Sequence, residues 1–506
     1  MLFISLLALT SVGCGRSRDQ VQARHSTITV LYPVDERAVG PFWQYPSQFL
    51  VFLPLVVRNA KGELEGRLAE SWEHSPDYRT WTIHLRKGVR WQDGIPVTAH
   101  DIKFTLDLMG HPAVLMMPPG ACSVTVVDDS TLTINYHEQA VSPLDDYTVY
   151  YPKHLLEGLD PKKFYDWEFW THPVGDGPYR YVHHLAKTMM EFEANPDYFR
   201  GKPKIERVVL KFGDAAHGKG ALIEFLSGNV DAVPFIEETD LLKMPGGSRF
   251  RLYYYLEPGT VTGIVWNERQ PLFRDPKIRR ALTLAINRRE LQQLINLPNK
   301  IPIFDVIFTR EQFRRAVLPD PLPYDPQLAK ELLDGAGWRI ADGEALRHRD
   351  GKPFRFTALV TPEDKAAVFI QEQLRRVGID MEISTLEVEA ERHRVLSGDF
   401  EAAIFIGLHG SGTIGHVAVF GETNPIGYRN SKVAELLNRA AATMDPVEID
   451  RIYRQLWSIF QVDLPTTFLY PAVYTTVASL RVRGLSSPYR AEPVWYMEDL
   501  WLENEN

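Results

Sequence analysis

The sequence predicts a mixed α/β protein built from more than one folded unit. Its 506 residues exceed the ~150 residues that a single domain typically holds. Residues 50–170 carry several strand-like runs around one helix-like run, which indicates an α+β unit. From residue 258 onward, helix-like and strand-like segments alternate, which is typical of an α/β unit.

The N-terminal part begins with a β-rich run at residues 28–31 and continues with clear strand and helix signals. Residues 81–85 alternate apolar and polar side chains, which predicts a half-buried strand. Thr98, followed three residues later by Asp101, predicts the start of a helix that reaches Met109. Two further strand-like runs, 122–129 and 131–137, flank a turn. The stretch therefore predicts an α+β arrangement.

In the C-terminal part, two predicted helices begin with the same Asp-Pro pair. Asp275 precedes Pro276, and Asp325 precedes a second proline, so each aspartate can cap a helix with proline at its first position. A helix is predicted over 364–377, ended by Gly378 and followed by a strand in which apolar residues alternate. A helical stretch over 432–460 is interrupted at Asp445-Pro446.

Composition indicates a globular protein and excludes an obvious nucleic-acid binder. The chain is 44% hydrophobic and 24% charged, with a formal net charge of −9. A nucleic-acid partner would call for a basic patch or stripe. Only short basic runs occur, such as the pairs at 279–280 and 288–289, and we expect both pairs to lie on solvated helix faces.

The two cysteines, Cys14 and Cys122, lie in different sequence surroundings and have different expected roles. Cys14 follows a short apolar run and precedes a polar, basic stretch, which resembles the lipobox of bacterial lipoproteins, although Ser11 stands where Leu is usual. We expect residues 1–14 to be a signal peptide ending at an acylated Cys14, and 15–25 to be a tether; the alternative is a buried N-terminal helix. Cys122 is then a lone, buried thiol.

The sequence lacks the usual catalytic signatures. It contains no H-E-x-x-H, no G-x-S-x-G and no G-x-x-x-x-G-K-[ST] motif. Gly410, Gly412 and Gly415 spell G-x-G-x-x-G, but no helix-forming run or suitably spaced acid follows. His409 and His416 flank these glycines without a third ligand. We therefore predict no enzyme activity, no cofactor and no metal site.

Five segments, in order, resemble the family 5 extracellular solute-binding proteins, the receptors of peptide- and nickel-type ABC importers. They are residues 53–109, VGDGPYRYV at 174–182, NPDYFRGKPKIERVVLKF at 195–212, SGNVDAV at 227–233, and residues 265–291. The resemblance covers nearly the whole chain.

The resemblance implies a two-lobed periplasmic-binding-protein clamp, class II-like and of the three-domain oligopeptide-binding type. Lobe one would be discontinuous, with residues 26–50, 172–257 and 471–506. Residues 51–171 would form an inserted α+β subdomain, and residues 258–470 would form lobe two. Ligand would be enclosed between the lobes by hinge closure.

The resemblance also locates a ligand loop. Peptide-binding relatives carry an acidic run there that pairs with the peptide's amine, whereas residues 407–420 have no acid. We expect His409, Ser411, Thr413 and His416 to bind ligand, which suits a carboxylate, a sugar or a chelate better than a cation. The alternative is a glycine loop that only shapes the cleft.

Three aromatic residues are further candidates for ligand contact: Trp43, Tyr45 and Trp266. Trp43 and Tyr45 follow the first strand, and Trp266 lies near a lobe crossing. Their rings could stack on ligand. The alternative is packing in the core, which is where large aromatic side chains mostly lie.

The expected function is that of an ABC-importer receptor that captures a peptide-like or other small polar solute. It would be periplasmic or extracytoplasmic, anchored to the membrane by lipid at Cys14, a monomer, and a partner of ABC permease subunits, with no nucleic-acid partner. Two alternatives stay open. One is a nucleotide-dependent enzyme, and the other is a sensor or chaperone that uses the same clamp without transport.

Overall fold

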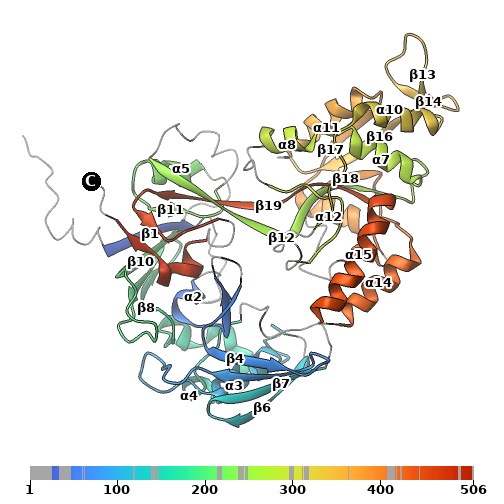
Figure 1. Cartoon of the computed structure of the whole chain (residues 1–506). Helices are drawn as coiled ribbons and strands as arrows, with labels where there is room; N and C mark the ends of the chain where they lie inside the picture. The colour runs from blue at the N-terminus through green and yellow to red at the C-terminus, as the bar shows by residue number, and fades with distance from the viewer. Residues whose placement is uncertain are drawn as a thin grey trace, which may run out of the picture.

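The structure of the protein is a computed structural model (Figure 1), and it describes residues 26–503 with internal gaps. Two bodies are joined by a pair of long strands, β12 (Phe250–Trp266) and β19 (Thr466–Ser479), and a smaller sheet lies below one of them. The residues outside the description are 1–25, 33–46, 60, 62, 115, 118–119, 138–143, 145–147, 213–218, 237–243, 245–248, 296–300, 310–311, 313–317, 363, 407–415, 417–418, 422–423, 444, 488–491 and 504–506.

One ten-stranded sheet runs through both bodies. We call the half that contains β8 to β11, with the segments packed on it, lobe one, and the half that contains β16 to β18 lobe two. Across the sheet the strands are β17 (Asp380–Thr385), β16 (Arg355–Val360), β18 (Ala402–Ile406), β12, β19, β11 (Ala232–Val233), β1 (Thr27–Tyr32), β10 (Arg207–Phe212), β9 (Met189–Ala194) and β8 (Tyr179–Leu185).

The connection between the lobes is the antiparallel pair of β12 and β19. Phe250 pairs with Ser479 in lobe one, and Val265 pairs with Thr466 in lobe two. The register shifts twice along the pair, between residues 257 and 261 and between 262 and 263 of β12. Such bulges bend a strand and increase its twist. The joint between the lobes is therefore an irregular part of a continuous sheet.

Lobe two is a sheet covered by helices on both faces. Successive strand residues point to opposite faces, so Ile264 packs in one core and Val265 in the other. Leu282 and Ile370 close the first core, and Leu456 closes the second. The helices are α7 (Pro276–Leu284), α8 (Arg288–Leu294), α10 (Pro326–Gly335), α11 (Lys365–Arg375), α12 (Val388–Ser397), α14 (Ser431–Ala441) and α15 (Pro446–Asp463).

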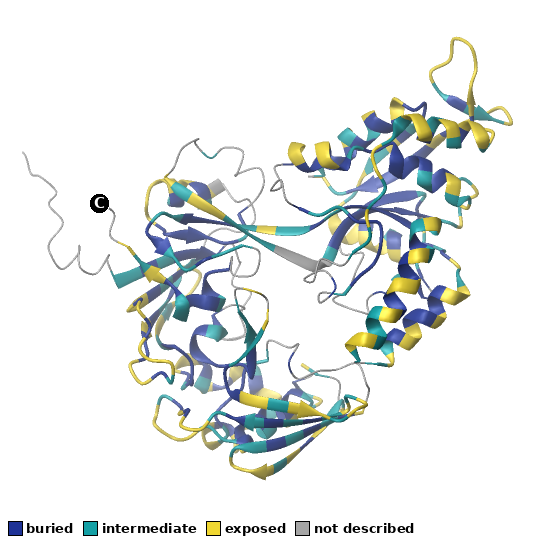
Figure 2. Ribbon diagram, viewed as in Figure 1, coloured by how far each residue is buried: buried dark blue, intermediate teal, exposed yellow. Residues whose placement is uncertain are grey.

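The smaller sheet is antiparallel, with the order β4 (Ala69–His74), β5 (Thr80–Leu85), β7 (Thr131–Tyr136) and β6 (Cys122–Asp128). Helix α3 (Ala99–Met109) packs on it. The unit does not close its core alone, because Trp91, Met109 and Trp170 lie in the core of lobe one. Figure 2 shows this buried material continuing from the small sheet into lobe one.

Short elements complete the structure. They are α2 (Gln48–Val51), β2 (Val56–Arg58), β3 (Leu64–Gly66), α4 (Lys153–Leu156), η1 (Pro161–Asp166), η2 (Glu168–Thr171), α5 (Lys219–Leu226), β13 (Arg339–Ile340), β14 (Arg347–Arg349), β15 (Lys352–Pro353), β20 (Val482–Arg483), η3 (Val494–Asp499) and β21 (Trp501–Leu502). Within the described part of the chain, no helix is both long and apolar enough to cross a membrane.

Several expected elements are confirmed at their ends. Thr98 and Asp101 form a reciprocal capping box at the start of α3. Asp275 caps α7 by accepting from the Lys277 N–H, and Asp325 caps α10 in the same way from Leu328. The mixed α/β architecture with a large sheet is also as expected.

The expectation that the two basic pairs lie on solvated helix faces is wrong for Arg279 and Arg288, which are 2% and 4% exposed. Arg279 donates to the carbonyl of Leu464 just after α15, which would otherwise lack a donor. Arg288 forms an ion pair with the buried Asp305 at 2.6 Å. Cys122 is half-buried rather than fully buried.

Candidate functional site

The strand directions place two sets of strand ends opposite each other. In lobe one, β11 runs from Ala232, opposite Ala478, to Val233, opposite Val477, so β11 and its parallel neighbours β1 and β10 run toward lobe two. In lobe two, β18 ends at Ile406, opposite Thr262, so β18, β16 and β17 run toward lobe one. Ligands of open α/β sheets bind outside the carboxyl ends of the strands. The space between the facing edges is therefore the candidate site.

A row of six aromatic side chains lies along the lobe-one side of this site. We call it the aromatic row. From one end to the other, its ring centroids are 6.4, 5.4, 6.4, 6.3 and 6.0 Å apart, in the order Tyr32, Phe235, Tyr474, Tyr255, Trp495 and Phe49.

The row is assembled from segments far apart in the chain. Tyr32 ends β1, Phe235 follows β11, Tyr255 and Tyr474 lie on the two connecting strands, and Trp495 lies in η3. Tyr32 is buried, Tyr474 is 40% exposed, and the others are half-buried. Rings that are partly exposed at a strand edge can stack on the planar or apolar parts of a solute.

A buried carboxyl group forms hydrogen bonds to two members of the aromatic row. Glu492 accepts a hydrogen bond from the hydroxyl of Tyr32 and another, at 2.8 Å, from the backbone N–H of Trp495. Burial raises the pKa of Glu492 to about 8, although the N–H of Trp495 acts in the opposite direction. Glu492 is therefore largely uncharged at neutral pH and holds two members of the row by hydrogen bonds.

Two acids lie at the described part of the lobe-two edge. Asp364 follows β16 and caps α11 by accepting from the N–H of Ala366 at 2.8 Å. Glu391 lies on α12, after β17, and is 3% exposed. Burial, and second the charge of Asp364, raise the pKa of Glu391 to about 7, and burial also raises the pKa of Asp364. The two halves of the site therefore differ in chemistry.

The small sheet also approaches lobe two at the outer end of the site. Tyr78, in the turn between β4 and β5, has a φ of 57° and stacks on His74 with ring centroids 3.9 Å apart. Its pKa is raised by burial and second by the charge of Asp445, which caps α15. The turn and the start of α15 are therefore near enough for their charges to interact.

The glycines of the VGDGPY segment position the lobe-one side. A Cβ atom at Gly175 would lie 1.9 Å from the carbonyl oxygen of Val51, and one at Gly177 would lie 2.7 Å from that of Leu50. Between them, Asp176 accepts from the N–H of Leu53 at 2.9 Å. Only glycine allows this approach, so the segment fixes α2 and the start of β2 against lobe one.

Two of the predicted ligand residues lie inside lobe two. Trp266 is fully buried, packs on Phe273, and donates its indole N–H to the hydroxyl of Thr467 at 3.0 Å. His416 is 1% exposed and hydrogen-bonds to the hydroxyl of Tyr453 at 2.6 Å, and burial lowers its pKa to about 3. The environment of Trp266 agrees with the packing alternative, and a direct ligand contact of either residue stays a prediction.

The other predicted site residues lie outside the described part of the chain: Trp43, Tyr45, His409, Ser411, Thr413 and the lipidation residue Cys14. The structure does place their neighbours. Tyr32 ends β1 and Ile406 ends β18, so the last described residue before each of the two segments stands at a facing strand edge. Across residues 26–503, apart from the gaps given above, no three His, Cys, Asp or Glu side chains are grouped to hold a metal ion.

Sequence reasoning missed most of the described residues at the site. Tyr32 and Phe235 could have been found, because each stands at the end of a strand-like run. Asp364 also carried a signal, since it caps a predicted helix directly after a strand. Tyr474 and Glu391 carried none, because only the sheet order brings them to the strand edges.

Comparison with known proteins agrees with this architecture. Residues 63–413 match the model of the bacterial extracellular solute-binding proteins, family 5. A Brucella ovis protein assigned as an ABC transporter peptide-binding protein is 28% identical over 472 residues, which are 87% of each chain. The oligopeptide-binding protein AppA of Bacillus subtilis is 26% identical over 433 residues, or 80% of this chain and 77% of AppA.

A solved structure shows the same fold. NikA from Brucella suis, crystallised with Fe(III)-EDTA, matches with a TM-score of 0.75 at 20% identity, over 94% of this chain and 100% of NikA. The protein therefore belongs to the family 5 bacterial extracellular solute-binding proteins, and its fold is that of the two-lobed clamp. It is a solute-binding receptor.

Proposed function

We propose that the protein captures a peptide-like or other small polar solute between its lobes and delivers it to the permease of an ABC importer. The observation that carries this proposal is the pair of facing strand edges, joined by β12 and β19 and lined on one side by the aromatic row. Closure must be favoured by ligand, so the ligand has to contact both lobes in the closed form more strongly than in the open form.

The moving bodies in this proposal are residues 26–50, 172–257 and 471–506 as lobe one and residues 258–470 as lobe two. Residues 51–171 move with lobe one. Their shared core supports this assignment, since Tyr151, Phe164 and Trp170 pack with Val208 of lobe one.

The ligand residues in this proposal come from both edges. Trp43 and Tyr45 follow Tyr32 in the sequence, and His409, Ser411 and Thr413 follow β18 in the sequence. Relatives support a broad choice of solute, because AppA is named for oligopeptides and NikA was crystallised with an iron chelate. We propose binding without chemistry, in keeping with the transport role of these relatives.

Location and partners complete the proposal. The receptor works outside the cytoplasmic membrane as a monomer, held there by acylation of Cys14 after removal of residues 1–13, and docks on ABC permease subunits. The apolar run before Cys14 and the extracellular family support this location. Mass spectrometry of the mature protein tests the anchor, and an unmodified Cys14 on an uncleaved chain would contradict it.

The central experiment is a search for bound solute. Native mass spectrometry of the purified protein identifies any solute that is carried along, and thermal-shift measurements then compare peptides, sugars and metal chelates. We expect at least one class to raise the melting temperature. Stabilisation by NAD alone would instead favour the enzyme alternative.

A matched pair of variants ties binding to the aromatic row. Tyr474→Ala removes a ring that is 40% exposed beside the site, and Tyr324→Ala removes one that is 42% exposed on lobe two. Loss of a stacked ring weakens binding by about 0.5–1.5 kcal/mol, or roughly 2- to 12-fold. We expect this loss for Tyr474→Ala only, as measured by calorimetry with the stabilising solute; equal affinities in both variants would exclude the row from the site.

A further inference from the structure

A small pocket opens beside the aromatic row, where α2, the β2–β3 hairpin and η3 meet. Its volume is about 20 Å³, which is room for one water-sized or methyl-sized group. Two members of the row, Phe49 and Trp495, form part of its wall. The other apolar walls come from Leu53, Pro54, Val57, Pro178, Val494 and Met497.

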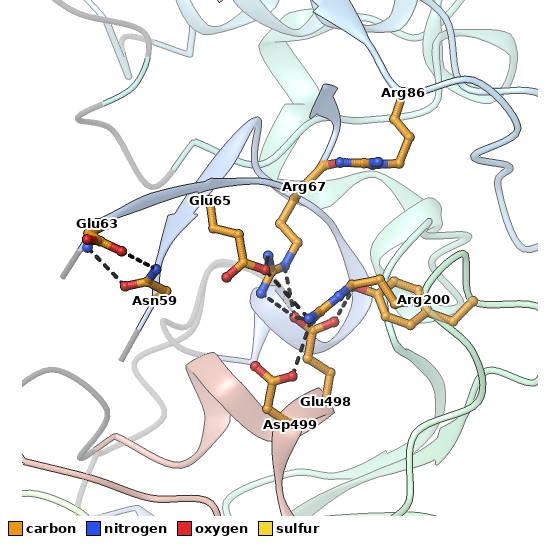
Figure 3. A network of polar contacts seen from close by, with 9 residues as sticks. Asn59, Glu63, Glu65, Arg67, Arg86, Arg200, Glu498 and Asp499 are labelled. Carbon is orange, nitrogen blue, oxygen red and sulfur yellow. Dashed lines mark hydrogen bonds and ion pairs between the residues drawn. The ribbon is translucent and has the colours of Figure 1, made fainter. Parts of the chain in front are cut away.

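The two charged residues at the pocket, Arg67 and Glu498, already satisfy each other. The Arg67 guanidinium donates to Glu498 at 2.8 Å and to Glu65 at 2.7 Å. Glu498 also accepts from Arg200 at 2.7 Å and from the hydroxyl of Tyr198. Figure 3 shows these groups converging on Glu498 between the hairpin and η3.

This network decides which chemistry the pocket accepts. Arg67 is 2% exposed, and its side-chain nitrogens are engaged by the two carboxylates. A charged ligand group would lose its hydrating water on entering the pocket. Because the charges of the network already pair with each other, this loss would not be compensated, and binding of a charged group is unfavourable. The remaining walls are apolar, so an uncharged group gains by leaving water.

The pocket is also within reach of a solute that lies on the row. Trp495 makes T-shaped contacts with both Tyr255, at 6.3 Å between ring centroids, and Phe49, at 6.0 Å. Trp495 therefore belongs to both the row and the pocket. A solute that stacks on Tyr255 therefore lies next to a ring that lines the pocket.

We propose that this pocket receives a short, uncharged aliphatic group of the captured solute and so sets a preference among related solutes. The proposal rests on the proposed receptor function and adds the chemical class of the ligand group that lobe one binds. The size of the pocket favours a methyl group over a longer or aromatic one. Each methylene that leaves water raises affinity about fourfold.

The experiment changes the pocket at Val57, a half-buried wall residue on β2. The full-length protein and its variants are each mixed with a synthetic pool of tri- and tetrapeptides, and the retained peptides are identified by mass spectrometry. We expect the unaltered protein to prefer Ala over Gly and over Lys about fourfold at one peptide position. Val57→Phe, which fills the pocket, should remove this preference, and Val57→Ala, which enlarges it, should shift the preference to Val.

A second valine gives the matched control. Val127 lies on β6 with 64% of its surface exposed, so Val127→Phe makes the same change away from the pocket and should keep the preference. Melting temperatures of all variants show whether each one folds. An unchanged preference in both Val57 variants would overturn the proposal, as would the absence of any aliphatic preference in the unaltered protein.

Failure of the proposed function gives a different result. If the unaltered protein retains no peptide at all, its assignment to peptide-like solutes is contradicted, and crystals under xenon pressure test the pocket alone. Xenon should occupy the pocket of the unaltered protein and be absent from Val57→Phe. An empty pocket in both crystals would overturn the proposal.

Discussion

The two lobes each bury an arginine beside an aspartate, but they take the two partners from different distances along the chain. In lobe one, Arg481 donates to Asp231 at 2.8 Å across 250 residues. In lobe two, Arg288 donates to Asp305 at 2.6 Å across only 17 residues. Asp231 also accepts from the N–H of Thr29. Lobe one thus joins the beginning, middle and end of the chain, whereas the buried ion pair of lobe two joins residues close in sequence.

This difference indicates that the lobes can lose structure separately. The core of lobe one includes Val494, Met497 and Leu500 from the end of the chain together with Ile28 and Val30 from its beginning. The cores of lobe two use residues between 261 and 469. A defect in one ion pair should therefore loosen its own lobe first.

The largest expected effect comes from removing either aspartate. Asp231→Ala and Asp305→Ala each leave an arginine buried without its partner, which typically costs about 3–5 kcal/mol of folding stability. Hydrogen exchange should rise in β1, β11 and the end of β19 for the first variant, and in α8 and its neighbours for the second. Measurement by mass spectrometry resolves the two lobes.

The control for this prediction is Glu503→Ala. Glu503 pairs with Arg483 at 2.7 Å but is half exposed, so its loss should cost less than about 1 kcal/mol. If either aspartate variant raises exchange equally in both lobes, the lobes unfold as one unit and the comparison fails.

The next effect is on the pH dependence of stability, to which a buried group in each lobe contributes in opposite directions. Glu492 in lobe one has a folded pKa raised from 4.5 to about 8, so its contribution to stability is complete below 4.5 and is lost as the pH rises toward 8. His416 in lobe two has a folded pKa lowered from 6.5 to about 3, so its contribution is complete above 6.5 and is lost as the pH falls. Glu391 acts in the same direction as Glu492, but only up to about 7.

The variant that tests this is Glu492→Gln, which keeps a hydrogen-bonding amide without the titration. The free energy of unfolding, measured by urea titration from pH 5 to 8.5, should decline with pH in the unaltered protein. This one group contributes at most about 1.4 kcal/mol per pH unit to the decline. We expect a flatter profile in the variant between the unfolded pKa of 4.5 and the folded pKa of about 8, because only there do the two states differ in bound protons. The same decline in Glu492→Gln and in the control Glu503→Gln would refute the assignment to Glu492.

The smallest effect compares two turns. Lys187, between β8 and β9 of lobe one, has a φ of 58°, and Asp350, between β14 and β15 of lobe two, has a φ of 52°. Asn and Asp adopt this left-handed conformation more readily than Lys. Lys187→Asn should therefore raise stability by a few tenths of a kcal/mol, and Asp350→Asn should leave it unchanged, as measured by thermal unfolding. A loss in Lys187→Asn would show that the Lys187 side chain outweighs the backbone preference.

Local structure could be predicted from the sequence because its causes are local. The capping box of Thr98 and Asp101 and the Asp-Pro starts of α7 and α10 involve residues within a few positions of each other. The alternation in β5 predicted its burial pattern for the same reason. The family resemblance extended these signals to the clamp.

The site could be predicted only in part, because it depends on sheet order. Tyr32, Phe235 and Tyr474 meet because β1, β11 and β19 are neighbours in the sheet, which local periodicity does not encode. Trp266 illustrates the opposite case, since its position near a lobe crossing suggested exposure, whereas its side chain points into the core that α7 covers. The buried Arg279 was missed because its partners are carbonyl groups at the distant end of α15.

The continuous pair of β12 and β19 has a mechanical consequence. The 17 residues of β12 span about 55 Å, and hydrogen bonds join this strand to β19 on both sides of the register shifts. A two-stranded ribbon resists stretching and sliding because each such motion breaks hydrogen bonds, but it yields to twisting and bending at its bulges. A small twist at the bulges should therefore rotate the two lobes relative to each other. The parts of each lobe that lie farthest from the bulges should move the greatest distance.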